Sequence, residues 1–420
     1  MSASKVLFIV LVCELINVAY YASFFYKNHF LPAPFFMDIN DTFMDFYNPL
    51  YWVIKDGFYT TFSSVYPALN YFILKIFSFG VDPNSIATPF ELRKLFPELG
   101  WINAGIYLLI IGFVVNIKKW NDLKIIYRFF AFFACALGAP VLFGIERGNM
   151  IFWALPFLAL YLGASNSWLK AIFFGLLVNI KPYFGILLVQ YLNIYAFDKK
   201  QIFKSTLISL IIFIFFGFFA GLDFFGFFKS YIQFSKKGTI SYEGIIAIPH
   251  SLVALTAIKY FIVSDHGSSY AFWFSFLKVV GYLVTFLMLI IGVIKPLNKL
   301  ELLIGSFLLL TNFSISTGGY ILIIYIVLIP YLLNSCEYEK MIFPILVIFS
   351  FPFDWMRLII INAHEKISYL GGDVVIGDIN FWIGLGSIVR PVMNFLLILF
   401  FVVHVLKKYR TKQISPISTV

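Results

Sequence analysis

Long apolar stretches constrain this chain more than any other feature of its sequence. A helix needs about 20 consecutive apolar residues to cross a bilayer. Stretches of about this length lie at 6–26, 202–222, 271–294, 341–360 and 385–406. Apolar residues occupy 61% of the 420 positions and charged residues only 12%, whereas a soluble chain averages about 25% charged residues. The sequence therefore predicts a polytopic integral membrane protein and not a soluble domain.

The first of these stretches is predicted to be a helix that stays in the protein. It begins after Lys5 and contains Glu14 and Asn17, and it lacks the small-residue cleavage site that ends a signal peptide. We therefore expect a first membrane helix here and not a removed leader.

Basic residues between the apolar stretches predict the orientation, because cytoplasmic connections carry an excess of Lys and Arg. The basic clusters lie at 118–128, 199–204, 295–299 and 407–410. If these clusters and the N-terminus are cytoplasmic, about 12 crossings (range about 10–14) satisfy the count. The longer connections then fall on the outer face, at 27–65, 223–270 and 361–384.

Two further apolar pieces, 66–80 and 245–263, do not fit this count. Either they enter the membrane without crossing it, which requires cover from protein or from a water-filled cavity, or the neighbouring helices have the other orientation. No soluble domain of about 50 residues separates from the rest, and no period marks a repeat array. We expect an all-α bundle that forms one membrane domain over 1–420, with re-entrant or amphipathic pieces in its outer loops.

Several classes of function lack their motifs in this sequence. Cys13, Cys135 and Cys336 stand apart from one another in or beside apolar runs, which argues against a disulfide framework or a thiolate metal site. Metalloprotease, redox, nucleotide-binding and serine-hydrolase motifs are also missing. The net charge of +10 comes from basic residues in short loops, so nucleic acid is not an expected partner. We expect no cofactor and no metal.

The first outer connection, 27–65, concentrates carboxylates in a chain that has only 21 acidic residues. Asp38, Asp41, Asp45 and Asp56 all lie within it. A solvated loop is the simplest interpretation of the first two and of Asp56. Asp45 differs because its sequence neighbours are aromatic, and a partly desolvated carboxylate can become a useful general base. Asp45 is therefore the candidate catalytic residue.

A second polar group, formed by Glu146, Arg147 and Asn149, interrupts two apolar runs. Charges within a membrane or at its edge are costly and commonly functional. Two interpretations stay open. Glu146 and Arg147 could pair and tie two helix ends together, or Gly148 and a helix that begins at Asn149 could form an anion site.

Lys181 is the third candidate, because it lies with Asn179 in the middle of an otherwise apolar segment. Pro182 breaks the helix at this point. A lysine here could be an anchor that extends to the membrane surface, or it could hold a phosphate beside a lipid.

His250 and Tyr320 are weaker candidates. A lone histidine is more often structural than catalytic, and the Ser and Thr residues that precede Tyr320 commonly bond their own backbone or a neighbouring helix in membranes. In the predicted orientation, however, all of these polar groups open to the outer face. We therefore expect one shared cavity there.

In their order along the chain, these residues resemble the GT-C glycosyltransferases, and most of all the polyprenol-phosphate-mannose-dependent α-1,2-mannosyltransferases of glycosyltransferase family 87. The resemblance extends from about residue 38 to about residue 335. It is carried by Asp45 with Tyr47, Gly57 with Tyr59, Tyr66-Pro67-Ala68-Leu69, Glu146-Arg147-Gly148-Asn149 and the segment from Gly175 to Pro182.

The resemblance implies a GT-C-like bundle in a bacterial cell membrane with its active site on the extracytoplasmic side. It implies an enzyme that moves a sugar from a polyprenyl-phosphate donor to a lipid or glycan acceptor. Membrane lipids would surround this enzyme. Asp45 would then be the base that deprotonates the acceptor hydroxyl, and Arg147 and Lys181 would be cations on the phosphate side. Glu146, Asn149, His250, Tyr66 and Tyr320 would complete the substrate-binding site.

The sequence also departs from the family pattern. Ala68 replaces a second proline, and the segment Ser316-Thr317-Gly318-Gly319-Tyr320 stands where relatives often have a Ser followed by a His-Tyr pair. The identity of the sugar and of the acceptor therefore stays open.

Two other classes of membrane protein remain as alternatives. An O-antigen polymerase or ligase also joins lipid-linked sugars outside the membrane but usually relies on arginines in outer loops, and the outer loops here are poor in arginine. A transporter or flippase for polyprenol-linked sugars would show paired broken helices in two related halves. The break at Pro182 has no evident counterpart in the sequence.

Overall fold

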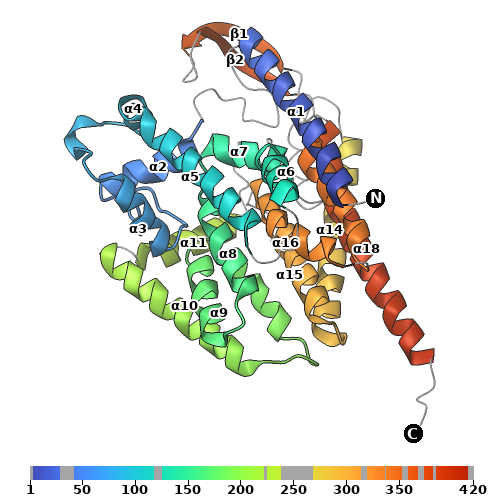
Figure 1. The fold of residues 1–420 in the computed structure, drawn as a ribbon. Helices are drawn as coiled ribbons and strands as arrows, with labels where there is room; N and C mark the ends of the chain where they lie inside the picture. Colours follow the sequence, from blue (N-terminus) through green and yellow to red (C-terminus); the bar gives the residue numbers. More distant parts are fainter. Residues whose placement is uncertain are drawn as a thin grey trace.

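The structure is a computed structural model that describes residues 3–28, 42–117, 125–221, 225–237, 268–313, 319–335, 337–351, 358–367, 373–381 and 385–414. Within these ranges the chain is almost entirely helical (Figure 1). The long helices are α1 (Ala3–Asn28), α5 (Pro97–Val115), α10 (Lys199–Phe219), α14 (Ser268–Ile294) and α18 (Leu385–Ile414).

Four helices in the described ranges are long and apolar enough to cross a membrane, with spans at Phe8–Lys27, Pro97–Val115, Lys199–Phe219 and Val389–Arg410. A fifth candidate is a bent pair, α7 (Ala139–Arg147) followed by Met150–Gly163, whose two parts meet at 107°. These helices fit an integral membrane protein and confirm three of the predicted stretches. The predicted count of about a dozen crossings is not confirmed by the described residues.

The predicted crossing at 341–360 is not confirmed by the described residues of this stretch. Helix α17 (Ile342–Ser350) has only nine residues, and the chain continues as strand β1 (Leu358–Ile367), which pairs antiparallel with β2 (Asp373–Phe381). The ladder runs from the pair Leu358 and Phe381 to the pair Ile367 and Asp373. This hairpin departs from the all-α prediction, and all of it except the first three residues of β1 lies in the predicted outer connection 361–384. Its β-branched run fits a strand as well as a membrane helix, so hydropathy alone cannot separate the two.

Shorter helices fill the space between the long ones: α2 (Met44–Ile54), α3 (Ala68–Phe77), α4 (Pro89–Leu95), α6 (Ile125–Ala136), α8 (Ala154–Gly163), α9 (Ser167–Val178), α11 (Gly226–Lys237), α15 (Lys299–Phe313) and α16 (Tyr325–Leu333), with 3-10 segments that include η2 (Met150–Trp153), η3 (Pro182–Tyr191) and η6 (Gly319–Ile324). Helix α9 packs between α8 and α10, and η3 packs on α15. Helix α3 has ten residues, too few to cross a bilayer, which fits the first of the two alternatives for 66–80, entry into the membrane without a crossing.

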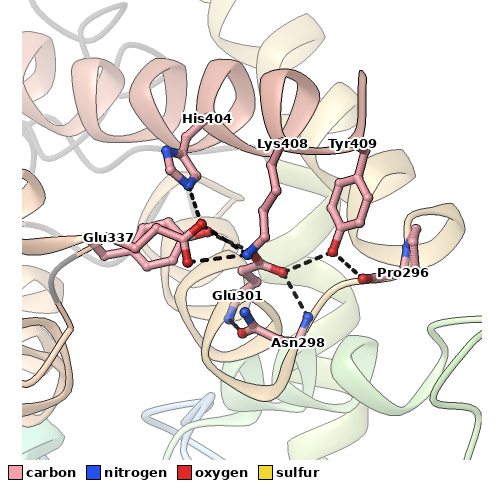
Figure 2. Close-up of polar contacts among 8 residues, drawn as sticks. Pro296, Asn298, Glu301, Glu337, His404, Lys408 and Tyr409 are labelled. Carbon is pink, nitrogen blue, oxygen red and sulfur yellow. Dashed lines mark hydrogen bonds and ion pairs between the residues drawn. The ribbon is translucent and has the colours of Figure 1, made fainter. Parts of the chain in front are cut away.

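A polar cluster ties α15 to the C-terminal half of α18 (Figure 2). The Lys408 ammonium lies 2.6 Å from the buried Glu301 carboxylate and 3.0 Å from Glu337, which also contacts His404 Nε2 at 2.8 Å. Tyr338 donates to the same Glu301 oxygen at 2.8 Å. Nearby, Asn193 donates to the carbonyl oxygens of Gly292 and Lys295. The connection into α10, the connection between α14 and α15, and the end of α18 therefore meet at one end of the bundle.

Three of the four predicted basic clusters, 199–204, 295–299 and 407–410, belong to these three connections. Their meeting agrees with the prediction that they share one side. Most of the fourth cluster, 118–128, lies outside the described residues.

Candidate functional site

Asp45 lies in the first turn of α2, inside the region that the sequence predicts to be the first outer loop. The helix begins after Phe43, whose backbone is left-handed with φ 60°. The Phe43 amide donates to the Glu146 carbonyl oxygen at 2.7 Å, which fixes the start of α2 against the end of α7. A carboxylate in the first turn is favoured by the positive end of the helix dipole. Asp45 is therefore held by a helix and not by a mobile loop.

Arg147 and Asn149 are brought together by a break between α7 and η2. Gly148 has φ +68°, and a side chain at this position would bring its Cβ within 2.8 Å of the Phe46 Cβ atom. Glycine is therefore required both for the left-handed backbone and for the close approach of α2. Asn149 then caps η2 by accepting from the Ile151 amide.

Both side chains that flank this glycine bind the carboxylate of Asp45. Arg147 Nη2 lies 2.7 Å from Asp45 Oδ1, and Asn149 Nδ2 donates to Asp45 Oδ2 at 2.7 Å. The side chains of Arg147 and Asp45 are 14% and 20% exposed. The centre of the site is thus an accessible ion pair that joins α2 to the break after α7.

Glu146 lies behind this ion pair and supports it. Its Oε1 accepts from the Thr42 hydroxyl at 3.1 Å, and the Thr42 carbonyl oxygen accepts from Arg93 at 2.6 Å. Arg147 forms an ion pair with Asp45, a partner that the sequence interpretation of the Glu146–Arg147 segment did not name. The Asn149 side chain caps η2, which has four residues, and the alternative of an anion site at this break stays a prediction.

Lys181 reaches the same site from the break between α9 and η3. Its side chain is 6% exposed, and its ammonium nitrogen lies 4.4 Å from the centre of the Tyr66 ring. Asn70 of α3 donates to the Ile180 carbonyl oxygen at 2.7 Å, which holds the Tyr66 segment against this break. Such burial contradicts the interpretation of Lys181 as an anchor that extends to the membrane surface.

Electrostatics also link Lys181 to Asp45. Lys181 lies between α9 and η3, outside the candidate spans. Burial lowers the pKa of Lys181 to about 8, although the nearby Asp45 carboxylate raises it. Near neutral pH the lysine is therefore mostly charged.

Tyr320 and Tyr66 complete the cluster. Tyr320, in η6, forms a side-chain hydrogen bond with Asn149 and interacts with the charges of Asp45 and Arg147. Tyr66 interacts with the same two charges and with Tyr320. The structure therefore brings together Asp45, Arg147, Asn149, Lys181, Tyr66 and Tyr320, with Glu146 behind them.

The remaining predicted residues do not join this cluster. Asp56 is 82% exposed and lies 4.0 Å from Lys75, which supports its interpretation as a solvated residue. Asp38, Asp41 and His250 lie outside the described residues. Across the described ranges, no group of three His, Cys, Asp or Glu side chains could hold a metal ion.

The sequence interpretation missed Thr42, Asn70, Tyr107 and Tyr183. Tyr107 of α5 donates to the Gly148 carbonyl oxygen at 3.0 Å, and the hydroxyl of Tyr183 interacts electrostatically with those of Tyr66 and Tyr320. The only sequence signal for Tyr183 was its position two residues after Lys181, because tyrosine and phenylalanine are abundant throughout the chain. Comparison with known proteins adds no assignment: no protein-family model, curated protein or solved structure matches this chain.

Proposed function

We propose that this chain is a membrane glycosyltransferase of the GT-C type, which moves a mannose-like sugar from a polyprenyl-phosphate donor to a lipid or glycan acceptor. The observation that carries the proposal is the meeting of one accessible carboxylate, Asp45, with two cations, Arg147 and Lys181. These residues come from three distant parts of the sequence, and they are the ones on which the family resemblance rests.

Asp45 has the geometry of a general base. A carboxylate offers about four lone-pair sites, and each oxygen of Asp45 accepts one recorded side-chain hydrogen bond, from Arg147 or from Asn149. The side chain is 20% exposed, so a sugar hydroxyl can approach a remaining lone pair. The two bonds also orient the carboxylate, which a base needs if it is to meet the hydroxyl in the reactive geometry.

The cations suit the other half of the reaction. The acceptor oxygen bonds to the anomeric carbon, and the bond from that carbon to the phosphate oxygen breaks with its electron pair left on the phosphate. The acceptor proton passes to Asp45. The leaving phosphate gains negative charge during this step, and a fixed cation beside it lowers the barrier. Lys181 suits this role because the structure records no carboxylate that pairs with its ammonium group in the described part of the chain.

The finer parts of the proposal concern the setting of the enzyme. We infer a bacterial cell membrane, a bundle with more crossings than the described spans, and an active site on the extracytoplasmic side. Support comes from the three basic connections, which share the end of the bundle that carries the C-terminal end of α18, whereas α2 and α7 lie toward the other end (Figure 1).

The test is sugar transfer by the purified protein in proteoliposomes. Mass spectrometry of lipid-linked and envelope glycans, with the gene present and deleted, first identifies the sugar and the acceptor. The protein should then transfer that sugar from its polyprenyl-phosphate carrier without added nucleotide. Glycans that are identical with and without the gene, together with no transfer from any polyprenyl-phosphate sugar, would overturn the proposal.

A further inference from the structure

Tyr183 carries a buried hydroxyl that the rest of the protein does not satisfy. It lies in the first turn of η3, and its oxygen has no hydrogen-bond partner within the described ranges. Its electrostatic neighbours are Tyr320 and Tyr66, which both interact with Asp45 and Arg147. The large majority of buried polar groups in proteins are hydrogen-bonded, and an exception needs an explanation. The position of this hydroxyl beside the site suggests that a ligand is its partner.

Lys181, two residues earlier, also has hydrogen-bond donors to spare. Its ammonium group has three donors, but its recorded contact among the described residues is with the face of the Tyr66 ring. Asp45, the carboxylate whose charge acts on Lys181, is already paired with Arg147. The break between α9 and η3 therefore presents one hydroxyl without a hydrogen-bond partner and one ammonium group that no recorded carboxylate pairs with in the described ranges. Their complement is an oxyanion with at least two acceptor oxygens.

We propose that the Tyr183 hydroxyl donates a hydrogen bond to the phosphate of the prenyl-linked donor and shares that phosphate with Lys181. This inference rests on the proposed function and assigns a further substrate-binding residue to it. The phosphodiester of the donor has one negative charge, and the prenyl phosphate that leaves gains a second as the bond to the anomeric carbon breaks. The Tyr183 hydroxyl is already in place before the bond breaks, so its hydrogen bond to the phosphate is stronger in the transition state than in the ground state. Tyr183 therefore contributes to turnover as well as to binding.

The test measures binding of farnesyl phosphate, farnesol and inorganic phosphate to the full-length protein in detergent, together with sugar transfer. Tyr183→Phe removes only the hydroxyl, and it should weaken farnesyl phosphate binding about tenfold or more and lower turnover further. Binding of farnesol, which lacks the phosphate, should not change. Tyr191→Phe is the matched control, because Tyr191 is the last residue of η3 and its hydroxyl is bonded to Tyr161. The control should bind farnesyl phosphate like the wild type.

The outcomes separate this inference from the proposed function. Farnesyl phosphate binding that is weakened by Lys181→Met but unchanged by Tyr183→Phe would overturn the role of Tyr183. So would a Tyr183→Phe effect on the sugar-bearing donor alone, because the hydroxyl would then contact the sugar. Equal effects on farnesyl phosphate and inorganic phosphate would support a phosphate site and locate its recognition in the anion and not in the lipid. If farnesyl phosphate binding depends on Tyr183 but the protein transfers no sugar, the phosphate site is supported and the proposed glycosyltransferase function is overturned.

A second variant protects the test against a folding defect. Incorporation of 2,3-difluorotyrosine at position 183 keeps the ring and the hydroxyl but makes the hydroxyl a stronger donor. Farnesyl phosphate should then bind more tightly at a pH where the hydroxyl is still protonated. Unchanged binding in this variant would contradict a hydrogen bond from Tyr183 to the phosphate.

Discussion

In the proposed reaction Asp45 is the general base, and its hydrogen bonds with Arg147 and Asn149 orient its carboxylate. Removal of its charge leaves Arg147 without its recorded carboxylate partner but keeps the shape of the side chain. A positioned base is worth about 100- to 10,000-fold in rate. We therefore expect Asp45→Asn to lower turnover at least about 100-fold while donor affinity changes little.

Asp56→Asn is the control for this prediction. Because Asp56 is 82% exposed, this substitution should leave turnover unchanged. Initial rates and donor binding in proteoliposomes measure both variants. Comparable activity of Asp45→Asn and the wild type would remove Asp45 from the reaction and leave its bonds as a tie between α2 and the end of α7.

The pKa of Lys181 predicts that the affinity for the sugar donor depends on pH. Burial lowers the pKa of its side chain to about 8, so in the ligand-free protein the positive charge is present below this pH and is lost as the pH rises through it. The affinity for the sugar donor should therefore weaken as the pH is raised from about 7 to about 9.5. The Lys181→Met variant should bind the donor weakly over the whole range.

Lys181→Arg keeps its charge because the pKa of arginine exceeds about 12. Its affinity should be nearly constant over the same range. Isothermal titration with a polyprenyl-phosphate sugar measures this, and a parallel decline in the wild type and in Lys181→Arg would assign the titration to another group.

At the scale of elements, the break after α7 is the feature that assembles the site. Gly148 has a left-handed backbone, in which an L-residue costs about 1–2 kcal/mol, and a Cβ there would meet Phe46. Gly148→Ala should therefore destabilise the protein by at least about this amount and lower activity, because it moves Arg147 and Asn149 relative to Asp45. Gly105→Ala is the control, since a Cβ at that position meets nothing within 4 Å. Thermal unfolding in detergent and transfer rates test the pair, and an inactive but equally stable Gly105→Ala would contradict this account.

Helix α1 carries a second testable feature. Glu14 is 0% exposed, and neither carboxyl oxygen has a hydrogen-bond partner in the described part of the chain. A buried unsatisfied polar group costs about 1–3 kcal/mol. Glu14→Leu should therefore raise the unfolding temperature. Asn17→Leu should lower it, because Asn17 donates to the Ser350 carbonyl oxygen at 2.8 Å. Loss of activity in a stabilised Glu14→Leu variant would show that Glu14 has a functional role.

The elements also show where sequence reasoning succeeds and where it stops. The stretches 6–26, 202–222 and 385–406 were predictable because length and hydropathy are local properties. The helix α2 and the strand β1 were not, since an aromatic segment beside carboxylates resembles a loop and a β-branched run resembles a membrane helix. The residues of the site were predictable from their polarity in apolar surroundings. Their pairing was not, because the contact between Arg147 and Asp45 depends on how distant segments pack.

At the scale of the whole molecule, the arrangement predicts two chemically different ends. The end with Glu301, Lys408 and the basic connections is tied by ion pairs (Figure 2), and the positive-inside rule assigns it to the cytoplasm. The segment that carries Asp45 lies in a connection assigned to the outer face. The two assignments together predict that an impermeant reagent distinguishes the two ends in sealed membranes.

Single cysteines test this in a background in which the native cysteines are replaced by alanine. Asp56→Cys lies just beyond α2 and is exposed, and Lys299→Cys and Arg410→Cys are exposed at the basic end. An impermeant maleimide added to intact cells should label Asp56→Cys, and it should label the other two only after permeabilisation. Ile145→Cys, which is partly exposed and leaves the Asp45–Arg147 ion pair in place, should follow Asp56→Cys, because this ion pair joins the two segments. Labelling of Ile145→Cys only from the cytoplasm would break the shared site, since residues on opposite faces of a membrane cannot act on one substrate.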